Sequence, residues 1–278
     1  MKTYIIGSNG FLGSHLSEWF DKHGEVRKAP AYDSAATSRW QETVMEDLRS
    51  FKPNIVFIAG ACQNMLDDAV ALHSLLMSNC ELPCLVAQNL LMNAPLAKLV
   101  VFGTSWQYAD SDSYRPFNLY AASKQAGQDL LVHYSLCGLK ILQLIMFDTY
   151  GEDDSRNKLL KMLQDALAQD IEISTTTGEQ EIDLVHIDDV CAGIEAAVLE
   201  LDFWDSSAGV MIRGLGSGKP ILVKELICSV STQFEKPLRV RVGARDYRPR
   251  EVMKVFRKYK RPLGWLPVRK EFQAKTKK

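Results

Sequence analysis

Three side chains suited to proton transfer stand close together in the sequence: Thr104, Tyr120 and Lys124. Tyr120 and Lys124 are four residues apart, so on a helix they share one face. A phenol has a pKa near ~10 and exchanges protons poorly at neutral pH unless a nearby cation stabilises its phenolate. Lys124 would supply that charge, and Thr104 or the neighbouring Ser105 would bond the substrate oxygen. The set predicts proton transfer at a substrate oxygen.

A glycine-rich stretch near the start of the chain predicts where a cofactor would bind. The apolar run Tyr4–Ile6 leads through Gly7, Gly10 and Gly13 into a helix-like segment, Leu12–Phe20. Glycines at a strand exit let the backbone approach a pyrophosphate, and the helix N-terminus presents free N–H groups to it. The spacing is G-x-x-G-x-x-G, which differs from the commoner G-x-G-x-x-G. The residues expected to contact the cofactor here are Gly7, Asn9, Gly10, Phe11, Leu12 and Gly13.

The order of these motifs along the chain makes them stronger evidence together than any of them is alone. A Y-x-x-x-K pattern alone is frequent by chance, but here it follows a glycine turn and a Thr-Ser pair after an apolar run, Leu99–Phe102. Together they predict a hydride-transfer site, in which Tyr120 gives a proton to a carbonyl oxygen as hydride reaches its carbon. Tyr120 and Lys124 are then also expected to contact the cofactor.

The second expected strand, Glu25–Ala29, bears on the choice of cofactor. Nicotinamide enzymes often carry an acidic residue at the end of this strand, where it holds the ribose hydroxyls of NAD. This chain has Arg27 and Lys28 there, which predicts recognition of a 2′-phosphate and hence NADPH. Asp33 lies close enough to keep NADH possible, and two solvated surface cations are the plain alternative.

The first half of the chain alternates short apolar runs with helical periodicity, which predicts β-α-β units and a parallel sheet. Ile55–Ile58 is a continuous apolar run closing on Ala59, Gly60 and Ala61, small residues that leave room for a dinucleotide. A helix is expected over Leu72–Leu91. Asn79 within it is either a buried amide bonded to a loop or an active-site group.

Beyond Gly151 the pattern predicts a smaller mixed lobe. We divide the chain into a dinucleotide-binding domain, residues 1–150, and a part that mainly forms a substrate lobe, residues 151–278, interleaved with the first. His186 with the following Asp188-Asp189 is expected to cap a helix rather than bind metal. The expected helices are 159–167, 190–201 and 221–234, the expected strands 171–174, 210–212 and 239–242, and the expected loop 214–220.

Composition sets broad limits on function. The net charge of 278 residues is -1, so no overall field attracts nucleic acid, and the basic C-terminal end is expected to be a solvated face. The six cysteines lack metal-pair spacing and are expected to be buried free thiols. No signal peptide and no apolar run long enough to span a bilayer are recognised, so we expect a cytoplasmic protein without membrane or metal.

Over essentially its whole length the sequence resembles the extended short-chain dehydrogenase/reductases, the NAD(P)-dependent nucleotide-sugar epimerase/dehydratase family. That family implies an α/β fold with a Rossmann-type doubly wound parallel sheet and a smaller C-terminal lobe. It also implies Thr104, Tyr120 and Lys124 as the catalytic triad, a nucleotide-sugar substrate and a homodimer. The matching segments are 7–13, 59–61, 104–108, 120–124, 147–151, 178–180, 185–190, 247–249 and 263–265.

Departures from the family pattern bear on the substrate site. Many epimerases have Asn where this chain has Asp148, and Arg-Asp where it has Ile182-Asp183. The missing arginine leaves Arg248 as the candidate phosphate clamp, with Arg213 as a weaker second. Ser105 and Trp106 occupy the positions of the Asp-Glu pair that drives water loss in the dehydratases.

The same departures indicate a subfamily. The segments around 104, 147 and 178 look most like the branch containing the CDP-abequose and CDP-paratose synthases. This resemblance implies reduction of the C4 keto group of an NDP-4-keto-6-deoxyhexose, in deoxysugar and lipopolysaccharide O-antigen biosynthesis, with Ser105, Trp106, Asp148 and Arg248 at the substrate. An NAD-dependent epimerase is one alternative. A non-catalytic dinucleotide-binding scaffold or sensor is another.

Overall fold

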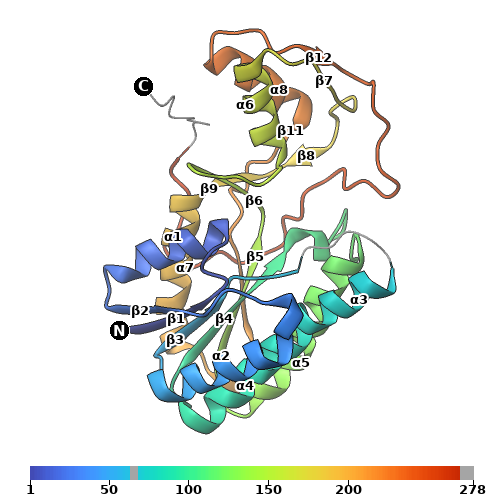
Figure 1. Cartoon of the computed structure of the whole chain (residues 1–278). Coiled ribbons are helices and arrows are strands. Elements are labelled where there is room, and N and C mark those ends of the chain that lie inside the picture. Colours follow the sequence, from blue (N-terminus) through green and yellow to red (C-terminus); the bar gives the residue numbers. More distant parts are fainter. Residues whose placement is uncertain (63–67, 270–278) are drawn as a thin grey trace.

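The computed structural model describes residues 1–62 and 68–269, and its main body is built on a parallel sheet (Figure 1). The sheet has six strands in the order β10-β5-β4-β3-β1-β2, and every neighbouring pair is parallel. The doubly wound Rossmann-type sheet expected from the sequence is confirmed. Its strands are β1 (Lys2–Ile6), β2 (Glu25–Lys28), β3 (Ile55–Ile58), β4 (Lys98–Thr104), β5 (Lys140–Met146) and β10 (Met211–Gly214).

Helices cover both faces of this sheet, which explains why β3 is apolar and buried at every position. In β3, Phe57 packs with Leu16 and Phe20 on one face, and Val56 packs with Val44 on the other. The first face is covered by α1 (Phe11–Asp21) and α7 (Ile187–Glu200), and the second by α2 (Thr37–Phe51), α4 (Leu82–Asn93) and α5 (Leu119–Leu136).

The helix expected over Leu72–Leu91 is present and longer. It runs as α3 (Ala69–Leu76), a π-helical turn (Met77–Glu81) and α4 without a break. By length and composition the stretch Ala69–Asn93 could cross a membrane, which corrects our expectation that no segment could. Val86 and Leu90 of this stretch are fully buried beneath α2 and α5, so contact with protein accounts for part of its apolar character.

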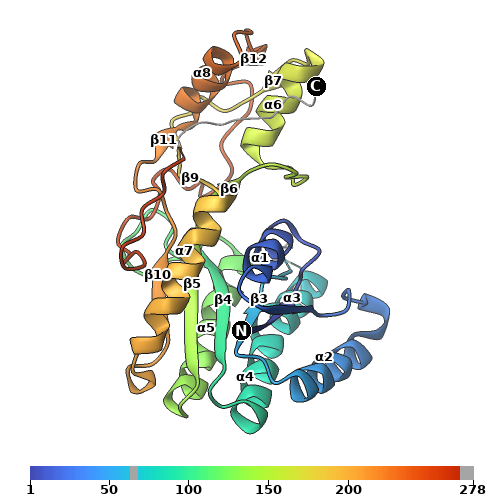
Figure 2. The same ribbon diagram turned by 90° about the vertical axis from the view of Figure 1, so that its left-hand side faces the viewer.

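A second, smaller lobe follows directly from the carboxyl end of β5 (Figure 2). Its core is formed where Leu163 of α6 (Leu159–Gln169) meets Leu226 and Val230 of α8 (Val223–Gln233). Three two-stranded sheets complete the lobe: β6 (Asp148–Tyr150) with β9 (Leu184–His186), β7 (Ile173–Ser174) with β12 (Val240–Arg241), and β8 (Glu181–Ile182) with β11 (Ile221–Leu222).

Two elements that we expected in the lobe belong to the main body. The strand β10 pairs with β5, and Val190 and Ile194 of α7 are buried with Leu16 of α1. Periodicity identifies a helix or a strand but does not show which of two cores it joins. The expected helix 221–234 is also shorter, because Ile221 and Leu222 form β11 before α8 begins.

The C-terminal strap, residues 246–269, contains no helix or strand and connects the two parts. Phe256 stacks on Tyr108 with ring centroids 4.1 Å apart, and the backbone N–H of Lys254 donates to Asp110 at 2.7 Å. The carboxylate of Glu181 in β8 accepts from the backbone of Val255. The strap therefore fixes the loop after β4 relative to the lobe.

Candidate active site

The glycine turn after β1 is closed by backbone packed on backbone. Gly7 has φ +86°, and a Cβ there would lie 2.2 Å from the backbone nitrogen of Gly60. A Cβ on Gly13 would lie 2.1 Å from the carbonyl oxygen of Gly7. The helix α1 begins after Gly10 with no side-chain cap, so its first N–H groups face the turn. This arrangement fits a dinucleotide pyrophosphate.

Beside the turn lies a cavity of about 500 Å³ over the carboxyl ends of β1 and β3. Asn9, Gly60, Ala61 and Tyr32 line it. The rings of Tyr32 and Trp40 pack edge to face, with their centroids 5.2 Å apart. The indole N–H of Trp40 donates to the carbonyl of Pro30 at 3.0 Å and fixes this wall. A glycine floor with aromatic walls suits the adenosine half of a dinucleotide.

The cations of β2 are placed differently from our expectation. The guanidinium of Arg27 lies 4.2 Å from the ring centroid of Phe51 and 3.8 Å from Asp47, and it does not line the cavity. Arg27 therefore cannot meet a 2′-phosphate in this arrangement, because its position on the strand turns it toward α2. Lys28 is exposed at the end of β2, next to the cavity residue Ala29, and Asp33 caps a 3-10 turn by accepting from Ala35.

Thr104 ends β4 at the carboxyl edge of the sheet. Its Oγ1 accepts the backbone N–H of Trp106 at 3.3 Å, which leaves its own hydroxyl proton for another acceptor. The side chain of Gln107 accepts the backbone N–H of Thr104 at 2.9 Å and closes the turn Ser105–Gln107. Ser105 is half-buried at the start of that turn.

Tyr120 and Lys124 lie on one face of α5, as their spacing predicts. The helix is capped where Asn118 accepts from the backbone of Ala121, and the Lys124 Nζ lies 5.8 Å from the Tyr120 ring centroid. Burial raises the pKa of Tyr120 to about 12, so the phenol keeps its proton at neutral pH. Burial lowers the pKa of Lys124 to about 8, against a smaller opposite effect of Cys80 and then Cys62.

The strap carries Arg248 to the loop after β4. Its guanidinium carbon lies 5.2 Å from the ring centroid of Phe117 and 5.8 Å from that of Trp106, and its Nε and one terminal nitrogen, Nη2, donate to the carboxylate of Glu251. Hydrogen bonding to Glu251, with a smaller contribution from the charge of Asp148, raises the pKa of Arg248. The structure thus brings together Trp106, Asp148 and Arg248, three residues expected at the substrate.

Arg213 does not join this group. It is buried on β10, where its guanidinium bonds the carboxylate of Glu200 of α7. This buried position contradicts the interpretation of Arg213 as a second phosphate clamp, because its side chain is closed off from a ligand while that of Arg248 is exposed.

A larger cavity, of about 810 Å³, opens in the lobe beside β6 and α6. Lys158, Lys161 and Lys236 line it with Asp148, and the Nζ of Lys158 lies 3.4 Å from a carboxylate oxygen of Asp148. Lysines around a cavity can bind phosphate groups. Sequence reasoning missed these residues because they stand far apart in the chain and match no short motif.

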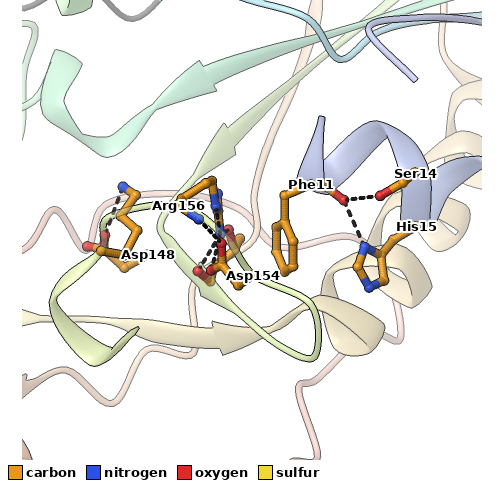
Figure 3. A network of polar contacts seen from close by, with 8 residues as sticks. Phe11, Ser14, His15, Asp148, Asp154 and Arg156 are labelled. Carbon is orange, nitrogen blue, oxygen red and sulfur yellow. Dashed lines mark hydrogen bonds and ion pairs between the residues drawn. The ribbon is translucent and has the colours of Figure 1, made fainter. Parts of the chain in front are cut away.

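A cluster around Arg156 ties the lobe to the glycine turn (Figure 3). The guanidinium of Arg156 lies 4.1 Å from the ring centroid of Phe11, the first residue of α1. It donates to Asp154 at 2.7 and 2.8 Å and to the carbonyl oxygen of Thr149 at 2.8 Å. Asp154 is only 7% exposed. Sequence reasoning missed this contact, which joins two segments far apart in the chain.

We expect Arg156→Met to lower the free energy of unfolding by about 1–3 kcal/mol, because the buried Asp154 carboxylate loses its partner. Cofactor affinity should fall too, since the Phe11 ring is released. Urea unfolding and a cofactor fluorescence titration measure the two effects. The control is Arg241→Met, which removes the exposed ion pair of Arg241 with Glu172 and should change stability by under about 0.5 kcal/mol. Equal stability of the two variants would contradict the role of Arg156.

The remaining candidate groups are structural. His186 caps α7 by accepting the backbone N–H of Asp188 at 3.2 Å, which confirms the expected helix cap. Within residues 1–62 and 68–269 no group of three or more His, Cys, Asp or Glu side chains could hold a metal ion. All six cysteines are free, but Cys137 and Cys228 are exposed, which corrects the expectation of buried thiols.

The parallel sheet, the glycine turn and the tyrosine-lysine helix define a dinucleotide-binding protein of the Rossmann class. The model of the NAD dependent epimerase/dehydratase family matches residues 3–207, and the chain belongs to that family. It is accordingly an enzyme of a family that acts on nucleotide sugars.

Individual relatives agree with this assignment. The chain is 24% identical to the CDP-abequose synthase of Yersinia pseudotuberculosis over 272 residues, which cover 94% of this chain and 93% of the relative. Two solved structures share the fold. MoeE5 in complex with UDP-glucose and NAD has a TM-score of 0.79 at 18% identity, covering 97% of this chain and 94% of its own. RMD from Pseudomonas aeruginosa complexed with NADPH has a TM-score of 0.76 at 15% identity, and the match covers 97% of this chain and 95% of RMD.

Proposed function

We propose that this protein reduces the C4 keto group of an NDP-4-keto-6-deoxyhexose with NAD(P)H, in deoxysugar and O-antigen biosynthesis. The observation that carries the proposal is a buried Tyr120 beside Lys124, with Ser105 and Trp106 in place of an acidic pair. A site with a proton donor but without acids for water loss suits reduction. The similarity to a CDP-abequose synthase supports the same substrate class.

Three residues of this chain, Tyr120, Thr104 and Lys124, carry out the proton transfer. A bound reduced nicotinamide supplies the hydride to C4. Tyr120 donates its phenolic proton to the C4 oxygen, so that the carbonyl, one hydride and one proton become an alcohol. The hydroxyl of Thr104 donates a hydrogen bond to the same oxygen, since its lone pair already accepts from Trp106. Lys124 stabilises the tyrosinate until a solvent proton restores the phenol.

We place the sugar nucleotide between the two cavities. Lys158 and Lys236 of the lobe cavity and Arg248 beside Trp106 would bind the diphosphate, although five acidic residues also line that cavity and Lys161 is paired with Asp165. Trp106 offers an aromatic face to the sugar, and Asp148 would accept from a sugar hydroxyl. The rings of Trp106 and Phe117 meet edge-on at 5.1 Å, which keeps that face in position.

We propose NADPH as the preferred cofactor, with NADH possible. Among the described residues that line the adenosine cavity none is acidic, so nothing there repels a 2′-phosphate. Neither cation of β2 lines the cavity, but Lys28 is exposed next to the lining residue Ala29 whereas Arg27 is turned toward Phe51, so we propose that Lys28 meets the 2′-phosphate. We expect Lys28→Ala to weaken NADPH binding about 5-fold or more while NADH binding stays unchanged. Arg27→Ala is the matched control and should leave both Kd values unchanged; the reverse pattern would contradict the assignment.

The pH dependence of the rate follows from Lys124. Its pKa of about 8 means that the ammonium loses its charge as the pH rises above that value. We expect kcat/KM to fall about tenfold per pH unit there, because a neutral lysine cannot stabilise the tyrosinate. The lowered pKa also means that charged Lys124 destabilises the folded protein below pH 8, an effect relieved as pH rises toward 10.5. A pH–rate profile flat to about pH 10 would contradict this.

We also propose that the protein is a homodimer. Large aliphatic side chains are exposed on the neighbouring helices α3 and α5, a surface suited to a second copy of the chain. They are Val70, Leu72, Leu76, Leu130 and Leu136.

An NAD-dependent epimerase is the second candidate. The placement of Arg27 favours it, because that arginine gives NADPH no contact in the adenosine cavity. The two functions are separated by mixing the protein with NADPH or NADH and a series of NDP-4-keto-6-deoxyglucose substrates. Loss of the absorbance of the reduced nicotinamide with a substrate that carries one particular nucleotide supports the reductase. No loss, with NAD released on denaturation, supports the epimerase.

A further inference from the structure

A series of hydrogen bonds leads from Thr104 across to α5 and out to the protein surface. The backbone N–H of Thr104 donates to Gln107 Oε1 at 2.9 Å. Gln107 Nε2 donates to Gln125 Oε1 on α5 at 2.8 Å, and Gln125 Nε2 donates to a carboxylate oxygen of Asp129 at 2.8 Å. Gln107 is completely buried, Gln125 is half-buried and Asp129 is exposed. We call the side chains of Gln107, Gln125 and Asp129 the glutamine relay.

The two ends of the glutamine relay fix the direction of every bond in it. A backbone N–H can only donate, so the atom of Gln107 that meets Thr104 is its carbonyl oxygen. An ionised carboxylate can only accept, so the group of Gln125 that meets Asp129 is its NH2. The inner bond then joins the NH2 of Gln107 to the oxygen of Gln125. Each amide has one orientation and cannot turn over without breaking two hydrogen bonds.

The space for the Gln107 amide comes from Gly103 of β4. A Cβ on Gly103 would lie 2.5 Å from Gln107 Oε1 and 2.7 Å from Gln143 Nε2, closer than such atoms approach one another. The φ angle of Gly103 is not positive, so its backbone conformation alone does not require glycine. The missing side chain therefore makes room for two buried amides, one of which holds the backbone of Thr104.

The glutamine relay joins the two elements that carry the proton-transfer residues. Thr104 lies at the end of β4, whereas Tyr120 lies on α5, so their separation depends on how the turn after β4 is held against the helix. The bond between Gln107 and Gln125 crosses from that turn to that helix. It therefore links the position of the Thr104 hydroxyl to the position of the Tyr120 phenol.

The helix itself is held on another side by Asn79 of the π-helical turn. Asn79 Nδ2 donates to Ser123 Oγ of α5 at 2.9 Å and to the carbonyl oxygen of Cys62 at 3.4 Å. The bond to Cys62 agrees with the plainer of our two expectations for Asn79, a buried amide bonded to a loop. Ser123 and Gln125 are two residues apart and so point to nearly opposite sides of α5. The helix is therefore a fixed frame for the relay.

We propose that Gln107 and Gln125 are positioning residues for the proton-transfer step, which hold the Thr104 hydroxyl at a fixed place relative to Tyr120. This role rests on the proposed function, because the two hydroxyl groups must meet on one substrate oxygen. The turn that Gln107 closes also orients Thr104 Oγ1, which accepts the backbone N–H of Trp106. Loss of the Gln107 bond therefore loosens the hydroxyl, and a displacement of about 1 Å can lower a rate about 10²-fold.

The kinetic test compares Gln107→Met and Gln125→Met, which nearly keep the side-chain volume and remove the amide. We expect kcat to fall about 10–100-fold in the first and about 10-fold in the second, with KM within about 3-fold of the wild type. Gln125→Glu keeps an acceptor for Gln107 and should recover most of the kcat lost in Gln125→Met. The control is Asn89→Leu, which removes a buried bond to the Met45 carbonyl; it should lower stability but leave kcat within about 2-fold.

A second readout needs no substrate. In protein labelled with ¹⁵N-threonine, the Thr104 amide signal is assigned by its loss in Thr104→Ser, and its hydrogen exchange is followed. We expect exchange to become about tenfold faster in Gln107→Met, because that variant removes the acceptor of this N–H. Exchange should stay within about 3-fold of the wild type in Asn89→Leu, which leaves the acceptor in place.

Wild-type kcat in both methionine variants would overturn the proposal, and so would unchanged Thr104 exchange in Gln107→Met. A raised KM with unchanged kcat would also overturn it, because that pattern reports weaker substrate binding and not a misplaced proton-transfer group. If Gln107→Met does not fold, the half-buried Gln125 decides: Gln125→Glu must be faster than Gln125→Met. Wild-type protein that shows the expected Thr104 exchange but no ketoreduction would contradict the proposed function and not the glutamine relay.

Discussion

Tyr120→Phe should lower kcat about 10²–10⁴-fold, the range for loss of a positioned proton donor. Phenylalanine keeps the ring, which packs with 9% exposure, and removes only the hydroxyl. Cofactor affinity should therefore change less than about 3-fold, which cofactor fluorescence measures alongside the steady-state rate. The loss should appear in kcat more than in KM, because the proton is needed in the transition state.

Tyr108→Phe is the matched control. Tyr108 follows β4 and the turn Ser105–Gln107, and its ring stacks on that of Phe256 in the strap, with ring centroids 4.1 Å apart. We expect its kcat to stay within about 3-fold of the wild type. A Tyr120→Phe enzyme as active as Tyr108→Phe would remove Tyr120 from the chemistry. Unchanged biological output of Tyr120→Phe would instead favour a non-catalytic dinucleotide sensor.

Gly13→Ala should lower both stability and cofactor affinity strongly. The new Cβ would lie 2.1 Å from the Gly7 carbonyl oxygen, and both sides of that contact are backbone, so no side chain can move aside. We expect the free energy of unfolding to fall by about 2–3 kcal/mol or more. Cofactor affinity should fall about 100-fold, because the turn and the first N–H groups of α1 shift together.

Gly10→Ala separates folding from cofactor binding. A Cβ on Gly10 meets only the carbonyl oxygen of Gly7, at an ordinary 3.5 Å, so stability should stay within about 1 kcal/mol of the wild type. Weaker cofactor binding in a stable Gly10→Ala protein would show that the pyrophosphate lies against this turn. Wild-type stability of Gly13→Ala, measured by urea unfolding, would contradict the backbone contact.

The residues predictable from sequence are those whose partners are near in the chain or at a regular spacing. Tyr120 and Lys124 share a helix face, and the apolar run Ile55–Ile58 must lie between two layers of helices. Gly7 and Gly13 could be recognised because a tight turn requires them. Short-range geometry alone explains these successes.

The other features depend on contacts between distant segments. The direction of Arg27 is set by Phe51 of α2, and the Arg156 side chain meets Phe11, in each case through a ring brought there by the fold. Periodicity also could not show that α7 and β10 join the main body and not the lobe.

The measurement that tests the central claim most directly is isotope transfer from C4-deuterated NADPH or NADH to an NDP-4-keto-6-deoxyhexose. A ketoreductase must place deuterium at C4 of the product sugar and oxidise one cofactor for each sugar reduced. Tyr120→Phe must lose this transfer while still binding cofactor. Product without deuterium, no net oxidation of added cofactor, and NAD released from the denatured protein would contradict the reductase and establish an epimerase instead.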